Sequence, residues 1–156
     1  MNGRYVTVTI PGRKKFLTFC EVQVFGKLAP FLPHVLPRPL NDLHRPLGVN
    51  IALGKISYQY STFHPLGSSD KAIDRNEASD FYKNSCTHTS DDFEPWWVVD
   101  LTSKFIVDNI MIIPRGDSCT GMTAKYEIRF GDSKENGGKS NPSFSYSEIL
   151  VFHDLQ

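Results

Sequence analysis

The chain has 156 residues, and its 17 basic and 17 acidic side chains give a formal net charge of zero. This length predicts one globular domain, because domains commonly hold about 100–200 residues. A zero charge balance argues against a protein that mainly binds a nucleic-acid backbone, since that requires a basic face. The longest apolar runs are far shorter than the roughly 20 residues of a membrane-spanning helix, which excludes membrane insertion.

The amino terminus and the cysteines bear on the cellular compartment. Residues 1–6 enter a strand-like pattern at once, so no signal peptide is visible. Three cysteines allow at most one intrachain disulfide and leave one thiol over. That number is too small for a scaffold built on disulfides.

Short segments rich in β-branched and aromatic residues, each bounded by turn-forming residues, predict strands along most of the chain. In chain order they are residues 4–10, 16–25, 50–60, 95–101, 105–113, 124–130 and 147–152. Residues 61–77 are expected to form a long polar loop, and helical spacing is hard to find. The pattern predicts an all-β fold, an antiparallel β-sandwich of the jelly-roll type, with function in the loops at one end.

One segment has a different composition. Five of the ten prolines fall between residues 28 and 48, where they remove backbone donors and disfavour helix. We therefore expect an extended linker at 28–48, which separates residues 1–27 from a main body at 49–156.

Three motifs in the main body form a recognisable set. Residues 85–88 read Ser-Cys-Thr-His, residues 95–97 read Pro-Trp-Trp, and residues 115–119 read Arg-Gly-Asp-Ser-Cys. With this set the chain resembles the F-type lectins, the fucolectin family of fucose-binding jelly rolls with a discoidin-like, galactose-binding-domain-like fold. His88 and Arg115 fall at the spacing that the family shows.

The order of the segments is unusual for that family. Residues 1–26 resemble its last two strands, whereas residues 151–154 resemble the segment that comes just before those strands. The chain is therefore either a piece of a tandem array or a circular permutant that closes on itself. Without the first two strands, sheet edges and core would be exposed, which favours self-closure. The linker can stretch to roughly 70 Å, so its reach is no obstacle.

The resemblance implies a disulfide between Cys20 and Cys86. It also suggests that Cys119 is a free thiol, because Ser118 stands where the family has a second, adjacent cysteine. The alternative is that all three thiols are free in a reducing compartment.

The resemblance gives His88 and Arg115 the role of holding the hydroxyls of a fucose ring, with Tyr82 as an aromatic wall. Arginine offers a planar fork of donors, and neutral histidine both donates and accepts. The alternatives are that Arg115 forms an internal salt bridge in a turn and that His88 is structural. Met122 occupies the position of the family's second arginine, a loss of about 1.5–3 kcal/mol for a charged hydrogen bond. Lys83 and Lys125 are the nearest candidates in the sequence to compensate.

A calcium site is also implied by the resemblance, because calcium prefers six to eight oxygen ligands from irregular loops. The positions that carry over are Lys71 (carbonyl), Asp74, Asn76, Ser85, Cys86 (carbonyl) and Glu21. Taken alone, an Asp-x-Asn sequence is more often a simple turn.

Taken together, the leading hypothesis is a secreted, calcium-containing lectin that recognises terminal L-fucose or related glycans in innate defence. Its partners would be fucosylated glycans, with homo-oligomerisation as an option. Catalysis is not expected, because no nucleophile elbow, phosphate loop or zinc spacing is present. The rival hypothesis is a degenerate discoidin-like adhesion or structural domain with weak or no sugar binding.

Overall fold

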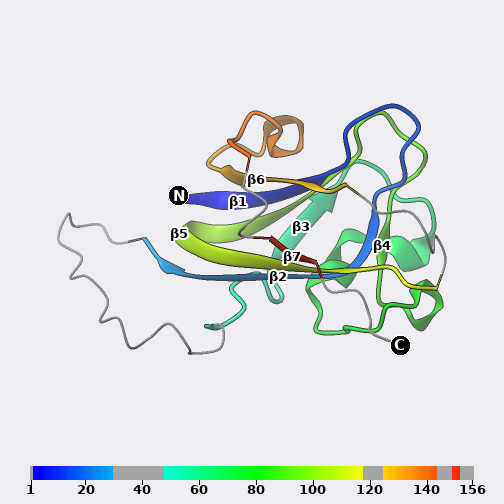
Figure 1. The fold of residues 1–156 in the computed structure, drawn as a ribbon, viewed down its shortest axis with the longest axis horizontal. Coiled ribbons are helices and arrows are strands. Elements are labelled where there is room, and N and C mark those ends of the chain that lie inside the picture. The colour runs from blue at the N-terminus through cyan, green and yellow to red at the C-terminus, as the bar shows by residue number, and fades with distance from the viewer. Residues whose placement is uncertain (1, 30–47, 118–124, 144–148, 152–156) are drawn as a thin grey trace.

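The computed structural model describes residues 2–29, 48–117, 125–143 and 149–151. Within these residues the fold is mostly antiparallel β-sheet with short 3-10 helices (Figure 1). The strands are β1 (Asn2–Thr9), β2 (Thr18–Leu28), β3 (Ile56–Gln59), β4 (Thr87–His88), β5 (Trp96–Pro114), β6 (Glu127–Gly131) and β7 (Ile149–Val151). The 3-10 helices are η2 (Pro65–Gly67), η3 (Ser69–Ile73), η4 (Phe81–Lys83) and η5 (Glu135–Gly138).

The long strand β5 organises the sheet. Its first half pairs with β1 on one side and with β3 on the other, and its second half pairs with β2 and, in parallel, with β7. Between the halves the register with β1 shifts, and Thr102 has a φ of 71°. Such an irregularity bends a strand, and β5 bends there so that its two halves contribute to two layers (Figure 1).

The main apolar core fills the space between the layers, and a second small buried cluster contains Cys20, Phe81 and Cys86. Alternate residues of each strand point into the main core, as a period of two requires. Its buried members include Val6, Val8, Val22, Val24, Trp97, Val99, Leu101, Ile110, Ile112, Ile128 and Phe130. Trp97 is fully buried and its Nε1 donates to the Ser69 carbonyl at 2.9 Å, whereas its neighbour Trp96 is only partly buried. The two layers and their shared core confirm the predicted β-sandwich.

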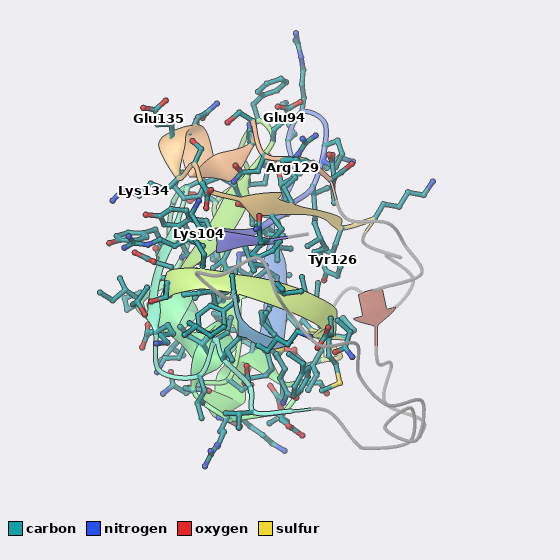
Figure 2. The ribbon with its side chains drawn as sticks, turned by 90° about the vertical axis from the view of Figure 1, so that its left-hand side faces the viewer. Glu94, Lys104, Tyr126, Arg129, Lys134 and Glu135 are labelled. Atoms are coloured by element: carbon teal, nitrogen blue, oxygen red, sulfur yellow. A yellow bond between two sulfur atoms is a disulfide. The ribbon has the colours of Figure 1, made fainter. Side chains whose placement is uncertain are left out.

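The outer edge of the β1–β6 layer is rich in charge. Arg129 on β6 pairs with Glu127, Lys104 with Asp132 at 2.6 Å, and Lys139 with Glu94 at 3.0 Å. Figure 2 shows Arg129, Lys134 and Glu135 on this side of the molecule. Charged side chains on an edge discourage pairing with another chain, so this edge is protected.

Several sequence predictions differ from the structure in detail. Only 56–59 of the expected strand at 50–60 is extended, because residues 51–54 form a turn in which Gly54 has a φ of 65°. The predicted loop at 61–77 contains η2 and η3, which carry too few turns to produce a helical pattern. The segments 95–101 and 105–113 belong to one continuous, bent strand.

The first two strands lie inside the sheet that the rest of the chain forms. β1 pairs with both β5 and β6, and β2 pairs with both β5 and β4. The division into residues 1–27, 28–48 and 49–156 stays a prediction, and most of the expected linker lies outside the described residues.

Candidate functional site

Three separate segments meet at one end of the sandwich. η4 supplies Phe81, β4 supplies His88, and Arg115 comes one residue after β5 ends. β4 is fixed there by pairing with β2, where Thr18 lies opposite His88. Asp80 caps η4, its side chain accepting the N–H of Tyr82 at 2.9 Å. Local pairing and capping therefore determine where these side chains lie.

His88 is half-buried among aromatic rings. Its ring centroid lies 5.6 Å from that of Phe16, 5.1 Å from that of Phe63 and 5.6 Å from that of Phe81. Its Nδ1 lies 2.6 Å from the Thr89 carbonyl, which can only accept, so Nδ1 carries the proton. Burial lowers the pKa of His88, and the positive charge of Arg115 lowers it further. At neutral pH the imidazole is uncharged, with Nε2 as an acceptor.

Arg115 is held by Asp117. Nε of Arg115 donates to Oδ1 and Nη2 donates to Oδ2, both at 2.8 Å, and the arginine side chain is only 9% exposed. The hydrogen bonds from Arg115 lower the pKa of Asp117 to about 2. The salt bridge that the sequence left open as an alternative is therefore present. It also fixes the plane of the guanidinium, which is useful for recognition.

Phe81 connects the two polar residues. The guanidinium carbon of Arg115 lies 4.6 Å from the centre of the Phe81 ring, and His88 contacts the same ring. The Phe81 N–H donates to Oδ1 of Asp117 at 3.0 Å. Phe81 and the positioning role of Asp117 were not predicted from the sequence, where the only signal for them is their closeness to Tyr82 and Arg115 in the chain.

The remaining predicted sugar residues are less informative. Tyr82 is 77% exposed and its ring contacts Phe81 at 5.5 Å. Lys83 and Lys125 are exposed. Met122, Ser118 and Cys119 lie outside the described residues.

Glu21 stands out among the predicted calcium ligands. It is fully buried, and neither of its carboxylate oxygens accepts a hydrogen bond from the described residues. Burial raises the pKa of Glu21 to about 8, helped by the negative charges of Asp74 and Glu77, although the nearby backbone amides of Arg75 and Asp74 oppose the rise. A buried carboxylate without a partner is costly, so Glu21 requires either a proton or a cation.

The Asp-x-Asn segment lies near this carboxylate and forms a turn. Oδ1 of Asp74 accepts the N–H of Asn76 at 2.9 Å, and Oδ1 of Asn76 accepts that of Ala78 at 3.3 Å. Arg75 between them has a φ of 72°. The turn expected as the alternative is therefore present, and the negative charge of Asp74 is close enough to Glu21 to raise its pKa.

Ser85, Lys71 and Cys86 are the other predicted calcium ligands, and all three lie within the described residues. Ser85 is buried, and its hydroxyl donates to the Asp80 carbonyl at 2.7 Å. Lys71 lies in η3, which packs against β2. The expected disulfide between Cys20 and Cys86 is present, and it joins the strand that carries Glu21 to the segment that carries Ser85.

Two further findings concern metal-binding clusters and membrane-spanning helices. Among the described residues, no three His, Cys, Asp or Glu side chains form a metal-binding group. A cation beside Glu21 would therefore depend on carbonyl, amide and hydroxyl oxygens as well. Over the same part of the chain, no helix has the length and apolar character needed to cross a membrane.

Comparisons with known proteins give consistent results. Residues 71–148 match the NedA-like, galactose-binding domain family. The pentraxin fusion protein of Xenopus laevis is 31% identical over 147 residues, which are 90% of this chain and 35% of that protein. The fucolectin of Anguilla anguilla is 39% identical over 91 residues, 54% of this chain and 58% of that protein. Fucolectin-1 of Anguilla japonica is 42% identical over 88 residues, 53% of this chain and 49% of that protein.

The chain therefore spans between about a third and just over half of the length of these relatives. No solved structure shows a significant match to it.

Proposed function

Because this chain belongs to the NedA-like, galactose-binding domain family, we propose that it is a non-enzymatic lectin module that binds L-fucose or a related sugar. The similarity to fucolectins covers about half of the chain. The family match at residues 71–148 includes the segment from Phe81 to Arg115, where the polar and aromatic cluster lies.

The arrangement of His88 and Arg115 around Phe81 carries the proposal. A sugar ring presents vicinal hydroxyls on its edge and C–H groups on its faces. Nε2 of neutral His88 accepts one hydroxyl proton, and the guanidinium of Arg115 donates to hydroxyl oxygens. Phe81 is buried and packs behind both side chains, so the apolar surface for the methyl group or the C–H face would come from the exposed ring of Tyr82 beside it.

Asp117 acts in this mechanism as a positioning residue. By holding one edge of the guanidinium, it lowers the entropy that Arg115 would lose on binding. Because the pKa of His88 is lowered, its imidazole is neutral at pH 7 and Nε2 can accept a hydroxyl proton. Recognition therefore rests on fixed hydrogen-bonding geometry, in agreement with a chain that has no net charge.

We also propose that Glu21 contributes to a structural calcium site. Its buried carboxylate has no hydrogen-bond partner among the described residues and lies near the charge of Asp74. Ser85 and the carbonyls of Cys86 and Lys71 are the further oxygens in this region. Calcium would neutralise the carboxylate and join β2 to the loop that leads to His88.

Secretion and a role in innate defence extend the same proposal. The Cys20–Cys86 disulfide is typical of proteins from oxidising compartments. Fucosylated glycans on cells or microbes would be the partners, and several weak sites on a homo-oligomer would increase avidity.

A degenerate adhesion domain is the second candidate. Met122 stands where the resemblance expects a second arginine, and Asp117 already occupies two donors of Arg115. In that case the ion pair would serve only to stabilise the loop after β5.

Calorimetric titration with methyl α-L-fucoside, in calcium and in chelator, separates the two candidates. The lectin proposal expects saturable binding that His88→Ala and Arg115→Ala both abolish. Arg129→Ala, which removes an arginine on β6 away from the cluster, should leave binding unchanged. If the wild-type chain does not bind and Met122→Arg does, the natural chain is a degenerate lectin; if neither binds fucosides, the lectin proposal fails.

A further inference from the structure

An exposed apolar stripe runs along β3, outside the sugar cluster and the predicted calcium ligands. Ile56, Tyr58 and Tyr60 alternate along the chain, so their side chains point to the same, outer face of the sheet. They are 58%, 44% and 48% exposed. Tyr60 follows β3 directly and extends its pairing with β5, because its N–H donates to the Trp96 carbonyl at 2.9 Å. A continuous row of exposed apolar side chains indicates a surface that contacts another molecule.

The outer edge of β3 is covered at Ser57. The hydroxyl of Ser69, in η3, donates to the Ser57 carbonyl at 3.1 Å and accepts the Ser57 hydroxyl at 3.0 Å. A partner therefore does not add a strand at this edge, where the carbonyl is already occupied. It would contact the outer face of the strand instead.

η5 borders this face and brings two opposite charges to it. Nζ of Lys134 lies 5.5 Å from the centre of the Tyr58 ring, and Glu135 is the next residue. Both side chains are exposed, and Figure 2 shows them on the same side of the molecule. Within the described part of the chain, neither of them forms an ion pair. η5 is fixed there by the Thr7 hydroxyl, which donates to the Gly137 carbonyl at 2.7 Å.

These charges are self-complementary, which favours a second copy of this chain as the partner. Across a two-fold axis the same patch meets itself, so Lys134 can pair twice with Glu135 of the partner subunit. An axis perpendicular to β3 and close to Tyr58 also places Ile56 opposite Tyr60 of the partner subunit. A partner of a single charge sign would instead face a like charge at one of the two positions, which is costly.

The size of the stripe sets the strength of the contact. From Ile56 to Tyr60 it is only about 13 Å long. Three partly exposed side chains bury less than the roughly 1,200 Å² at which stable interfaces begin. The contact would therefore be weak and reversible.

We propose that the outer face of β3, together with Lys134 and Glu135 of η5, is the contact surface of a weak antiparallel homodimer. The sugar cluster lies beyond Tyr60 along the chain, since the ring of Phe63 is 5.1 Å from that of His88. An antiparallel dimer would thus carry its two sugar sites at opposite ends and bridge two fucosylated surfaces. This bridging rests on the proposed lectin function, whereas the dimer does not.

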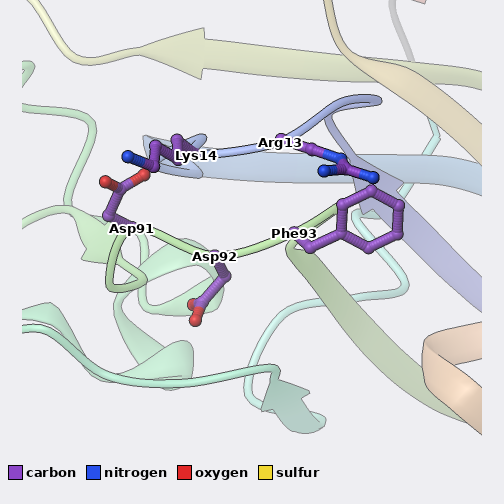
Figure 3. Close-up of a pocket in the computed structure, with 5 residues that line it drawn as sticks. All are labelled: Arg13, Lys14, Asp91, Asp92 and Phe93. Carbon is purple, nitrogen blue, oxygen red and sulfur yellow. The ribbon is translucent and has the colours of Figure 1, made fainter.

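A pocket at the loop end of the sandwich supplies a control position outside this contact surface. It has a volume of about 430 Å³, and Figure 3 shows the residues that line it, which are Arg13, Lys14, Asp91, Asp92 and Phe93. Lys14 is exposed, lies between β1 and β2, and points toward Asp91. Lys14→Glu therefore makes the same change in charge as Lys134→Glu, but away from β3 and η5.

Sedimentation velocity over a range of concentrations tests the dimer with the full chain. The wild-type chain should show a reversible monomer–dimer equilibrium with a micromolar Kd. Tyr58→Ala should weaken it about tenfold, because this ring lies at the centre of the contact. Lys134→Glu and Glu135→Lys should each weaken it about tenfold or more, since like charges then meet twice. Lys14→Glu should leave the Kd unchanged.

Mixing the two charge variants tests the two-fold geometry. One variant carries two acidic residues at positions 134 and 135, and the other carries two basic residues. An equimolar mixture should form heterodimers, although neither variant dimerises alone at that concentration. The double variant Lys134→Glu/Glu135→Lys should dimerise like the wild type. A mixture that stays monomeric would rule out the paired contact of Lys134 and Glu135.

The remaining outcomes separate the dimer from the lectin proposal. If the wild-type chain is monomeric up to millimolar concentration, or if none of the variants changes its Kd, the inference is wrong and the lectin proposal stands. Beads coated with L-fucose should be agglutinated by the wild type and not by the two charge variants, which should keep its affinity for methyl α-L-fucoside. Full agglutination by a monomeric variant would contradict the bridging. If the wild type binds no fucoside, the lectin proposal fails and bridging fails with it, while sedimentation still decides the dimer.

Discussion

Asp117 holds Arg115 at two points, through hydrogen bonds of 2.8 Å from Nε to Oδ1 and from Nη2 to Oδ2. The same carboxylate accepts the N–H of Phe81 at 3.0 Å. One acidic side chain therefore positions both the main hydrogen-bond donor of the proposed sugar site and the buried ring of Phe81 that packs against it.

Asp117→Ala should weaken the binding of methyl α-L-fucoside by roughly tenfold, because the loss of a charge-assisted bidentate pair frees the guanidinium. Asp117→Asn keeps an acceptor for the Phe81 N–H and should lose less. Calorimetry measures the affinities, and thermal unfolding shows whether each variant is folded. An unchanged affinity in folded Asp117→Ala would rule out the positioning role.

Sugar affinity should be constant from pH 8 to about 6.5 and should fall as His88 becomes protonated. Burial lowers the pKa of His88 below its usual 6.5, so the neutral form, with Nε2 as acceptor, persists to a lower pH than in a free histidine. The stability that neutral His88 contributes is present above pH 6.5 and is lost as the pH falls through its lowered pKa. Asp117, with a pKa of about 2, stays charged over this range.

His88→Gln is the control for that profile, because glutamine donates and accepts without titrating. Its affinity should be lower but independent of pH between 5 and 8. A wild-type profile that is flat to pH 5, or a glutamine variant that keeps the decline, would assign the effect to another group.

The fold could be predicted where the pattern was local. Val6 and Val8, like Ile110 and Ile112, alternate with outward-facing residues, and this alternation alone indicates a strand. The bend of β5 could not be predicted, because its cause is pairing with distant strands on both sides. A turn at Gly54 also replaced part of an expected strand.

The residues of the candidate site were likewise only partly predictable from the sequence. His88 and Arg115 could be chosen because they stand in recognisable motifs. Phe81 could not, because its importance depends on contacts with side chains from β4 and from beyond β5. The unpartnered carboxylate of Glu21 is likewise a matter of packing, which no spacing along the chain reveals.

Without calcium, stability should decrease as the pH rises from about 4.5 to 8. The pKa of Glu21 is raised to about 8 in the folded chain, so the folded state binds a proton that the unfolded state has lost over this range. Calcium should reverse the effect above pH 7, by about 2.7 kcal/mol when its concentration is 100 times its Kd. Chemical unfolding with calcium and with chelator measures both changes.

Glu21→Gln tests the assignment. It should make the calcium-free chain more stable at pH 8, since no buried charge remains, and should abolish the calcium response. Glu77→Gln removes an exposed neighbouring charge and should keep that response. If Glu21→Gln is stabilised by calcium as strongly as the wild type, the ion binds elsewhere.

Replacing both Cys20 and Cys86 by alanine should lower the free energy of unfolding by about 4 kcal/mol, as expected for a crosslink between residues separated by 66 positions. The variant should also bind calcium more weakly, because the bridge holds Glu21 against the segment with Ser85. A Cys119→Ser background prevents thiol exchange during the measurement. Peptide mapping of the oxidised monomer should recover residues 20 and 86 in one crosslinked pair. A folded monomer without that pair would contradict the intrachain disulfide, and a dimer crosslinked through the pair would show that the first two strands complete another chain.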